Sequence, residues 1–246
     1  MLKRFWNSGC LIAVIGAWLF LSTSAVAAIA LLGAPPNTRA VMLMGSGLVL
    51  LWVVLGGSFQ FLFRNPLRAF VRSIRIDGRV KFVVLAAILA LAEEAVTTTM
   101  TNLAPLFGVP YGSAYITASG NYFDVVCLHS VVVFIPMFVG WAFLLQRYDF
   151  SPNAVFLLFG LTGLTAEISL GGLQAIAQFG LWIFVYGLMV YLPAYTLPAD
   201  RGAKKPSGWM YIAAVFVPVL FAIPVAAAVG FAHPVKIHFP LIPPGS

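Results

Sequence analysis

Charged residues are scarce in this sequence of 246 residues, at 9%, whereas hydrophobic residues make up 61%. Water-soluble domains carry roughly 25% charged residues, because their surfaces must be solvated. A chain with so few charges cannot cover a surface that faces water, so its solvent must be mainly lipid. The composition therefore predicts a single membrane domain, located in the plasma membrane (bacterial inner membrane), without a separate soluble domain.

Cysteine is also scarce, because the chain has only Cys10 and Cys127, both in apolar runs. We expect two small buried residues that form no disulfide. The sequence has no Gly-x-Ser-x-Gly or His-Glu-x-x-His motif and no P-loop, which argues against serine or zinc proteases of those types and against direct use of ATP. The residues identify no cofactor.

Long apolar runs dominate what is present. A spanning helix needs about 20 apolar residues, and no irregular backbone can face lipid unpaired. The sequence therefore predicts an all-α, polytopic bundle of about seven transmembrane helices. The spans lie near residues 10–32, 40–63, 82–102, 123–145, 153–170, 175–197 and 209–231. Residues 153–197 are also compatible with two re-entrant half-helices.

Basic residues predict the orientation. Of the 14 lysines and arginines, all except Arg39 and Lys236 fall in inner segments if the N-terminus is cytoplasmic, which agrees with the positive-inside rule. The C-terminus is then outside. The first run follows Lys3 and Arg4 and resembles a signal peptide, but it is long enough to span, so we expect a retained helix. The clustering of charge in short loops points to a lipid partner and not to nucleic acid.

One inner segment is strongly basic. Five arginines recur every three or four residues, which predicts an amphipathic surface helix over residues 64–79 with one basic stripe: Arg64, Arg68, Arg72, Arg75 and Arg79. Such a stripe favours contact with anionic lipid or an acidic partner. The alternative is that these charges only set the topology.

Ionisable residues inside the spans are the main functional signal. Glu93, Glu94, Asp124 and Glu167 lie in or at the ends of predicted spans, as does His129. Such residues are costly in lipid and usually mark a site or line a wet cavity. Their depths gather them in the outer half of the bilayer. Because successive helical residues point about 100° apart, we expect one of the paired glutamates to face a cavity and the other a neighbouring helix.

A carboxylate and an imidazole can together activate a water molecule for hydrolysis. We therefore predict Glu93, Glu94 and His129 as catalytic residues. The same side chains are also metal ligands, so Glu94, His129 and Glu167 form a candidate metal-binding set.

The pair Glu93–Glu94 on one span, with His129 on the next, resembles the CAAX-protease and bacteriocin-processing family of glutamate-dependent intramembrane proteases. The resemblance implies a water molecule activated by glutamate and histidine within the membrane. It covers only residues 93–129. Thr98 stands where the family has arginine and Val125 where it has phenylalanine, and no later span supplies a second histidine.

Two further functions are compatible with these residues. The first is a transport or cation-binding protein whose carboxylates carry protons or a metal. The second is a non-catalytic subunit or scaffold of a larger membrane complex, in which the buried polar groups form hydrogen bonds between helices.

Overall fold

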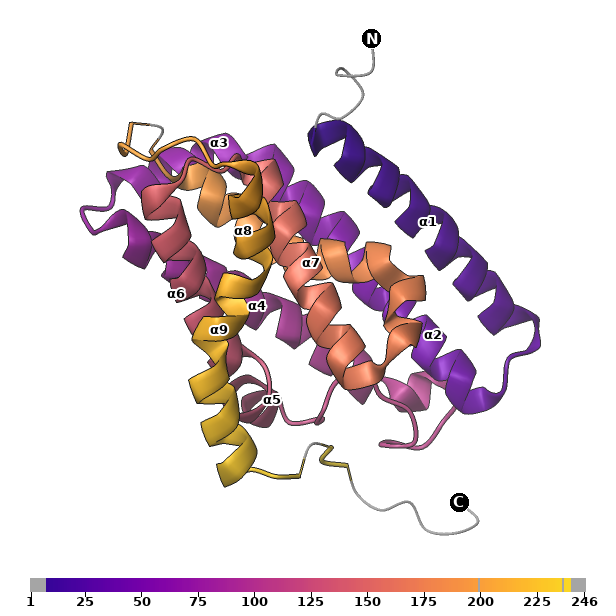
Figure 1. Ribbon diagram of the computed structural model, residues 1–246. Coiled ribbons are helices and arrows are strands. Elements are labelled where there is room, and N and C mark those ends of the chain that lie inside the picture. The colour runs from indigo at the N-terminus through magenta and orange to yellow at the C-terminus, as the bar shows by residue number, and fades with distance from the viewer. Residues whose placement is uncertain (1–7, 199, 236, 240–246) are drawn as a thin grey trace.

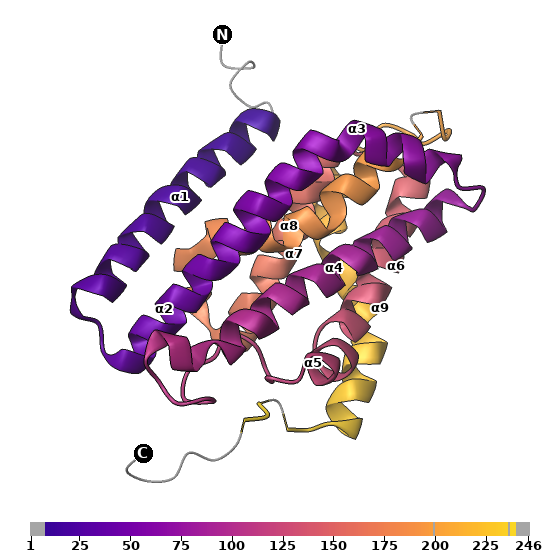
Figure 2. The same cartoon turned by 180° about the vertical axis from the view of Figure 1, so that it is seen from behind.

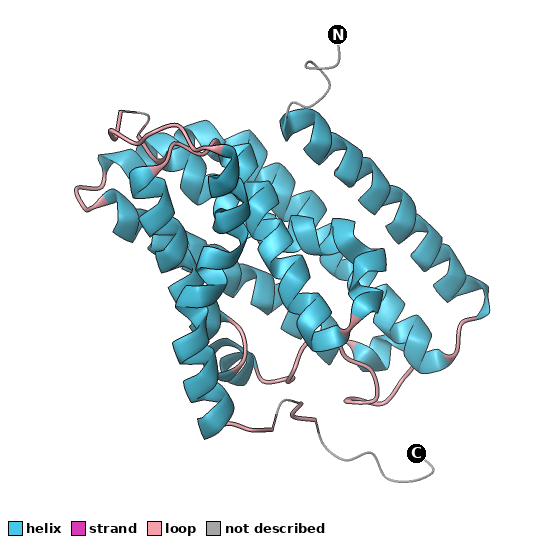
Figure 3. Ribbon diagram, in the orientation of Figure 1, coloured by secondary structure: helices cyan, strands magenta, loops and turns pink. Residues whose placement is uncertain are grey.

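The computed structural model describes residues 8–198, 200–235 and 237–239, which fold into a bundle of helices (Figures 1 and 3). Lys3, Arg4, Lys236 and residues 240–246, which entered the topology prediction, lie outside this part of the chain. The longer helices are α1 (Ser8–Gly33), α2 (Pro36–Leu48), α3 (Gly57–Ser73), α4 (Gly78–Asn102), α6 (Val131–Arg147), α7 (Pro152–Gly171), α8 (Phe179–Thr196) and α9 (Gly208–Ala232). The shorter ones are η2 (Val49–Gly56), η3 (Ala104–Phe107), α5 (Tyr122–Leu128) and η4 (Leu173–Gln178).

Four helical stretches among the described residues are long and apolar enough to cross a membrane: α1, Pro36–Ser73, Leu173–Thr196 and α9. The pair α5 and α6, which bends by 43°, makes a fifth if it is one broken span. Helices α4 and α7 are not in this group, and they carry the predicted glutamates. The fold is thus all-helical with the apolar helices of a membrane protein, as expected, whereas the number seven stays a prediction.

Helices α2 and α3 form one continuous helix with η2, a π-helical segment, between them (Figure 2). At the π-helix, the Trp52 indole N–H donates to the Val185 carbonyl of α8 over 3.0 Å.

The predicted surface helix over residues 64–79 differs from the structure. Its first part belongs to α3, with Pro66 inside the helix, and the helix ends at Ser73 before a turn into α4.

Several arginines of this basic segment already have protein partners. Arg72 donates to the carbonyls of Thr196 and Leu197. Arg79 pairs with Asp77 at 2.9 Å. Arg64 and Arg68 both lie against the ring of Tyr195 on α8. Arg75 lies in the turn and makes no such contact with the part of the chain that the structure describes. The segment therefore ties α3 to α8, a role that the arginine spacing alone did not indicate.

Small residues let α7 pack tightly against α8. A methyl group on Gly160 would lie 2.6 Å from the Ile183 carbonyl oxygen, and one on Gly163 would overlap the Tyr186 ring. The two helices are joined by Gly172, which has a φ of +88°, and by η4. Residues 153–197 therefore form two helices of 20 and 18 residues, and how they cross a membrane stays a prediction.

The connecting segments gather at two ends of the bundle. At one end Arg79 donates to Gln146, and Arg201 pairs with Asp149 at 2.6 Å. At the other end (bottom of Figure 1) lie the loop of residues 103–121, α5 and the segment after α9. This grouping agrees with the alternation of predicted inner and outer segments, although which end faces the cytoplasm stays a prediction.

Cys10 and Cys127 are both free, and both are exposed. The expectation that they are buried is therefore wrong. Both cysteines lie on the outer face of the bundle, where an apolar sequence would meet lipid.

Candidate metal centre

Helix α5 is short, and its two ends position one acid and one imidazole. The Asn121 side chain accepts hydrogen bonds from the backbone N–H groups of Phe123 and Asp124, so it caps the start of α5. The helix ends at Leu128, and His129 leaves the helical conformation with φ −130° and ψ −45°. Helix α6 then departs at 43°. This break places His129 on the same side as Asp124, which an unbroken span would not do.

The segment after α9, here called the tail (residues 233–235 and 237–239), returns across this end of the bundle. The His238 backbone N–H donates to the Ala118 carbonyl over 2.8 Å, and the two segments form an isolated bridge at Ser119 and His238. The Phe239 ring stacks on Tyr115 with centroids 4.8 Å apart. The tail is therefore docked onto the loop of residues 103–121.

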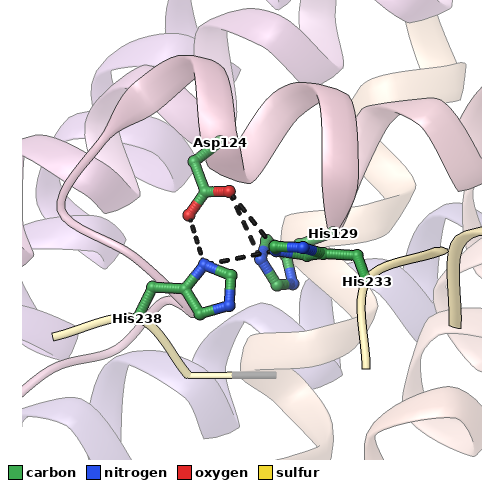
Figure 4. Close-up of side chains that lie close together, drawn as sticks. All are labelled: Asp124, His129, His233 and His238. Atoms are coloured by element: carbon green, nitrogen blue, oxygen red, sulfur yellow. Dashed lines mark hydrogen bonds and ion pairs between the residues drawn. The ribbon is translucent and has the colours of Figure 1, made fainter. Parts of the chain in front are cut away.

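Four side chains from α5, its end and the tail converge on one point: Asp124, His129, His233 and His238 (Figure 4). One ligand atom from each lies within 4.8 Å of all the others. The Asp124 carboxylate is 2.8 Å from His238 Nδ1, 3.6 Å from His233 Nε2 and 3.8 Å from His129 Nε2. The two tail histidines approach to 3.3 Å. The four side chains are 13–26% exposed, so the cluster is sheltered but within reach of solvent.

Hydrogen bonds determine which ring atoms point into the cluster. His238 Nε2 lies 2.7 Å from the Val235 carbonyl, to which it donates, and this leaves Nδ1 facing Asp124. Two acceptors would repel each other at 2.8 Å, so a proton or a cation must lie between them. Without a metal, the hydrogen bond to Asp124 raises the pKa of His238 above its usual value. His129 Nε2 is buried and makes no hydrogen bond within the described part of the protein.

These four groups are the right size for a tetrahedral zinc site. With zinc–ligand distances near 2.0–2.1 Å, neighbouring ligand atoms lie roughly 3.3–3.5 Å apart. Four of the six pairs of groups lie 2.8–3.8 Å apart here, through one or the other Asp124 oxygen, and all four groups lie within 4.8 Å of one another. Three imidazoles and one carboxylate are ligands that zinc commonly takes. The bond from His238 to Val235 also supplies the outer hydrogen bond that usually orients a ligating imidazole.

The predicted glutamates lie elsewhere, in the interior of the bundle. Glu93 and Glu94 are 5% and 7% exposed, and the Thr97 hydroxyl donates to Glu93 Oε1 over 2.7 Å. The Tyr186 hydroxyl donates to Glu167 over 2.5 Å. Both Glu93 and Glu94 line one cavity. The expectation that only one of them faces a cavity is therefore wrong, because the cavity is wide enough to reach both faces of α4.

The structure does not bring His129 together with these glutamates. Its neighbours are Asp124 and the two tail histidines, with ring centroids 5.2 Å from His233 and 5.0 Å from His238. Accordingly, Glu94, His129 and Glu167 do not form a ligand group among the described residues. His129 is the one predicted ligand that does join a metal-like cluster.

The sequence interpretation missed His233 and His238 and left Asp124 out of the site. One signal was available, since His233 and His238 repeat the five-residue spacing of Asp124 and His129. Two residues that are five positions apart do not lie on the same face of a helix. The spacing therefore indicates a shared site only where a helix ends between or beside the two residues, as α5 does before His129 and α9 does before His233.

Comparison of the chain with models of known families, with curated proteins and with solved structures found no match. The resemblance to glutamate-dependent intramembrane proteases therefore rests only on the residues quoted for it.

Proposed function

We propose that the chain is a polytopic membrane protein that binds one divalent transition-metal ion, with zinc preferred, through Asp124, His129, His233 and His238. One observation carries this proposal. The sequence has only three histidines, and all three converge on the same carboxylate, although Asp124 and His238 are 114 residues apart. Separate structural roles would not require this convergence.

The number of ligands indicates what the ion does. Catalytic zinc usually has three protein ligands and an open position for water, whereas structural zinc has four protein ligands. Asp124 and the three histidines supply four. The ion therefore fastens the tail to α5 and to the adjoining loop, and it stabilises this end of the bundle.

The proposed membrane arrangement retains seven spans. Helices α4 and α7 contain 25 and 20 residues, and about 20 residues suffice to cross the hydrocarbon. With the basic segments in the cytoplasm, the metal site lies on the outer side and Arg75 faces the inner surface, where it is free to meet anionic lipid. Association with other membrane subunits remains a further possibility for the exposed apolar helices.

Metal analysis tests the proposal directly. The purified protein is stripped with a chelator, reloaded with Zn²⁺ and measured by elemental mass spectrometry together with isothermal titration. We expect one zinc per chain, and loss of high-affinity binding in Asp124→Asn and His238→Ala. Phe239→Ala is the matched control, because this side chain docks the tail without offering a ligand, and it should retain zinc. Equal zinc binding by the wild type and Asp124→Asn would refute the proposal.

Hydrolysis by Glu93, Glu94 and His129 stays a prediction. It has less support than metal binding, because His129 Nε2 faces Asp124 at 3.8 Å, whereas Glu93 accepts from Thr97 and Glu94 from Ser130. Glu94→Gln separates the two proposals: it should abolish hydrolysis if the glutamate is catalytic, and it should leave zinc binding unchanged.

A further inference from the structure

A cavity of about 600 Å³ lies between α1, α2, α4 and α8. Cavities of this size commonly hold small organic ligands. Most of its wall is apolar, with side chains such as Leu19, Val49 and Leu181, and the loop residues Tyr115–Thr117 border it. The cavity is separate from the four metal ligands, none of which lines it.

Two carboxyl groups stand in this apolar wall. Glu93 and Glu94 both line the cavity and are more than nine-tenths buried. The Thr97 hydroxyl bonds one oxygen of Glu93. The Ser130 hydroxyl is the partner of Glu94, and it also lies 3.2 Å from the Val125 carbonyl. With one hydroxyl partner each, the two carboxyl groups retain acceptor capacity for a ligand.

No lysine, arginine or histidine is among the residues that line the cavity in the described part of the chain. Burying a carboxylate without a counter-charge is costly. No intramolecular ion pair among the described wall residues meets this cost, so each carboxyl group either takes up a proton or pairs with a cation that enters the cavity. A cationic ligand would supply the missing charge.

The rest of the wall is suited to the same ligand. Phe134, Trp182 and Tyr186 present aromatic rings to the cavity, and aromatic faces attract ammonium groups. These aromatic rings are independent of the glutamates and favour the same cationic ligand.

We propose that this cavity binds an amphipathic amine, with its ammonium group between Glu93 and Glu94 and its alkyl chain along the apolar wall. Helix α1 lines one side of the cavity, and of its residues only Ile15, Leu19 and Ala30 are buried. In the proposed arrangement the amine enters from the lipid beside this helix.

Three ligands with the same tail and different head groups test the charge requirement: dodecylamine, dodecanol and dodecanoate. Binding of each radiolabelled compound is measured to the full chain in zwitterionic nanodiscs, with empty nanodiscs subtracted. We expect saturable binding of one amine, about tenfold or more tighter than dodecanol, because hydrogen bonds to a buried charge are the strong ones. Dodecanoate should be excluded.

The double variant Glu93→Gln, Glu94→Gln keeps the size of both side chains and should weaken amine binding by about 10- to 100-fold, with little effect on dodecanol. Asp149→Asn is the control for a general loss of negative charge, because Asp149 lies at the end of the bundle away from the metal ligands and does not line the cavity. Circular dichroism and zinc content of the same samples report folding and judge the metal proposal separately. Equal affinity for the amine and dodecanol in the wild type overturns the cavity proposal, even if the double variant does not fold.

Discussion

Zinc should slow the opening of the tail, and the structure gives the size of the effect. Without metal, the described tail is held by the hydrogen bond from His238 to Ala118, by the bond between His238 and the Asp124 carboxylate, and by the stacking of Phe239 on Tyr115. A net hydrogen bond and an aromatic pair are worth about 1 kcal/mol each, and a hydrogen bond to a charged group about 2 kcal/mol. Opening should therefore cost about 4 kcal/mol in the metal-free protein.

Zinc binds the docked tail far better than the open one, since opening removes His233 and His238 and leaves two ligands. At a free zinc concentration 100 times its Kd, the docked state gains about 2.7 kcal/mol. The backbone amide of His238 should then exchange with solvent roughly 100-fold more slowly.

Hydrogen–deuterium exchange with mass spectrometry measures this on a peptide that contains His238. Phe239→Ala should speed exchange in the metal-free state and retain the slowing by zinc. Asp124→Asn should lose the zinc-dependent slowing. If zinc binds to the wild type with full stoichiometry and the exchange of His238 does not change, the tail is not fastened by the ion.

Two further predictions concern the bundle itself. Gly160→Ala should destabilise the protein by about 1–3 kcal/mol, since its methyl group meets the Ile183 backbone and cannot be accommodated by a side-chain movement. The control Gly230→Ala places its methyl group in open space and should be neutral or stabilising in thermal unfolding. Similar melting temperatures for the two variants would refute close packing of α7 on α8. Arg72→Gln should lower the free energy of unfolding by about 1–2 kcal/mol through the loss of its hydrogen bonds at the end of α8. The control Arg75→Gln removes the same charge but none of these hydrogen bonds, so it should have a smaller effect. Equal effects of the two variants would assign the arginines to topology alone.

Much of the fold was predictable, because lipid requires helices wherever the sequence is apolar over about 20 residues. The predicted span at 209–231 corresponds to α9, and that at 10–32 corresponds to α1. The breaks inside elements were not predictable from hydropathy. The π-helical segment Val49–Gly56 and the end of α5 before His129 depend on tertiary contacts, such as that of Trp52 with Val185.

The candidate site was predictable only in part. The cost of burying charge correctly marked Glu93, Glu94 and His129 as unusual, but burial alone does not say which of them meet. His129 finds its partners in the tail, which hydropathy treats as a featureless outer segment. Only the fold reveals that two histidines near the end of the chain lie beside an aspartate near its middle.

The order in which the chain is made gives this arrangement a further meaning. Asp124 and His129 are synthesised about a hundred residues before His233 and His238, so a growing chain displays half of the ligand set until α9 has passed into the bilayer. Metal capture at the proposed site would then have to wait for α9, and it would distinguish a molecule in which this helix is inserted from one in which it has stalled.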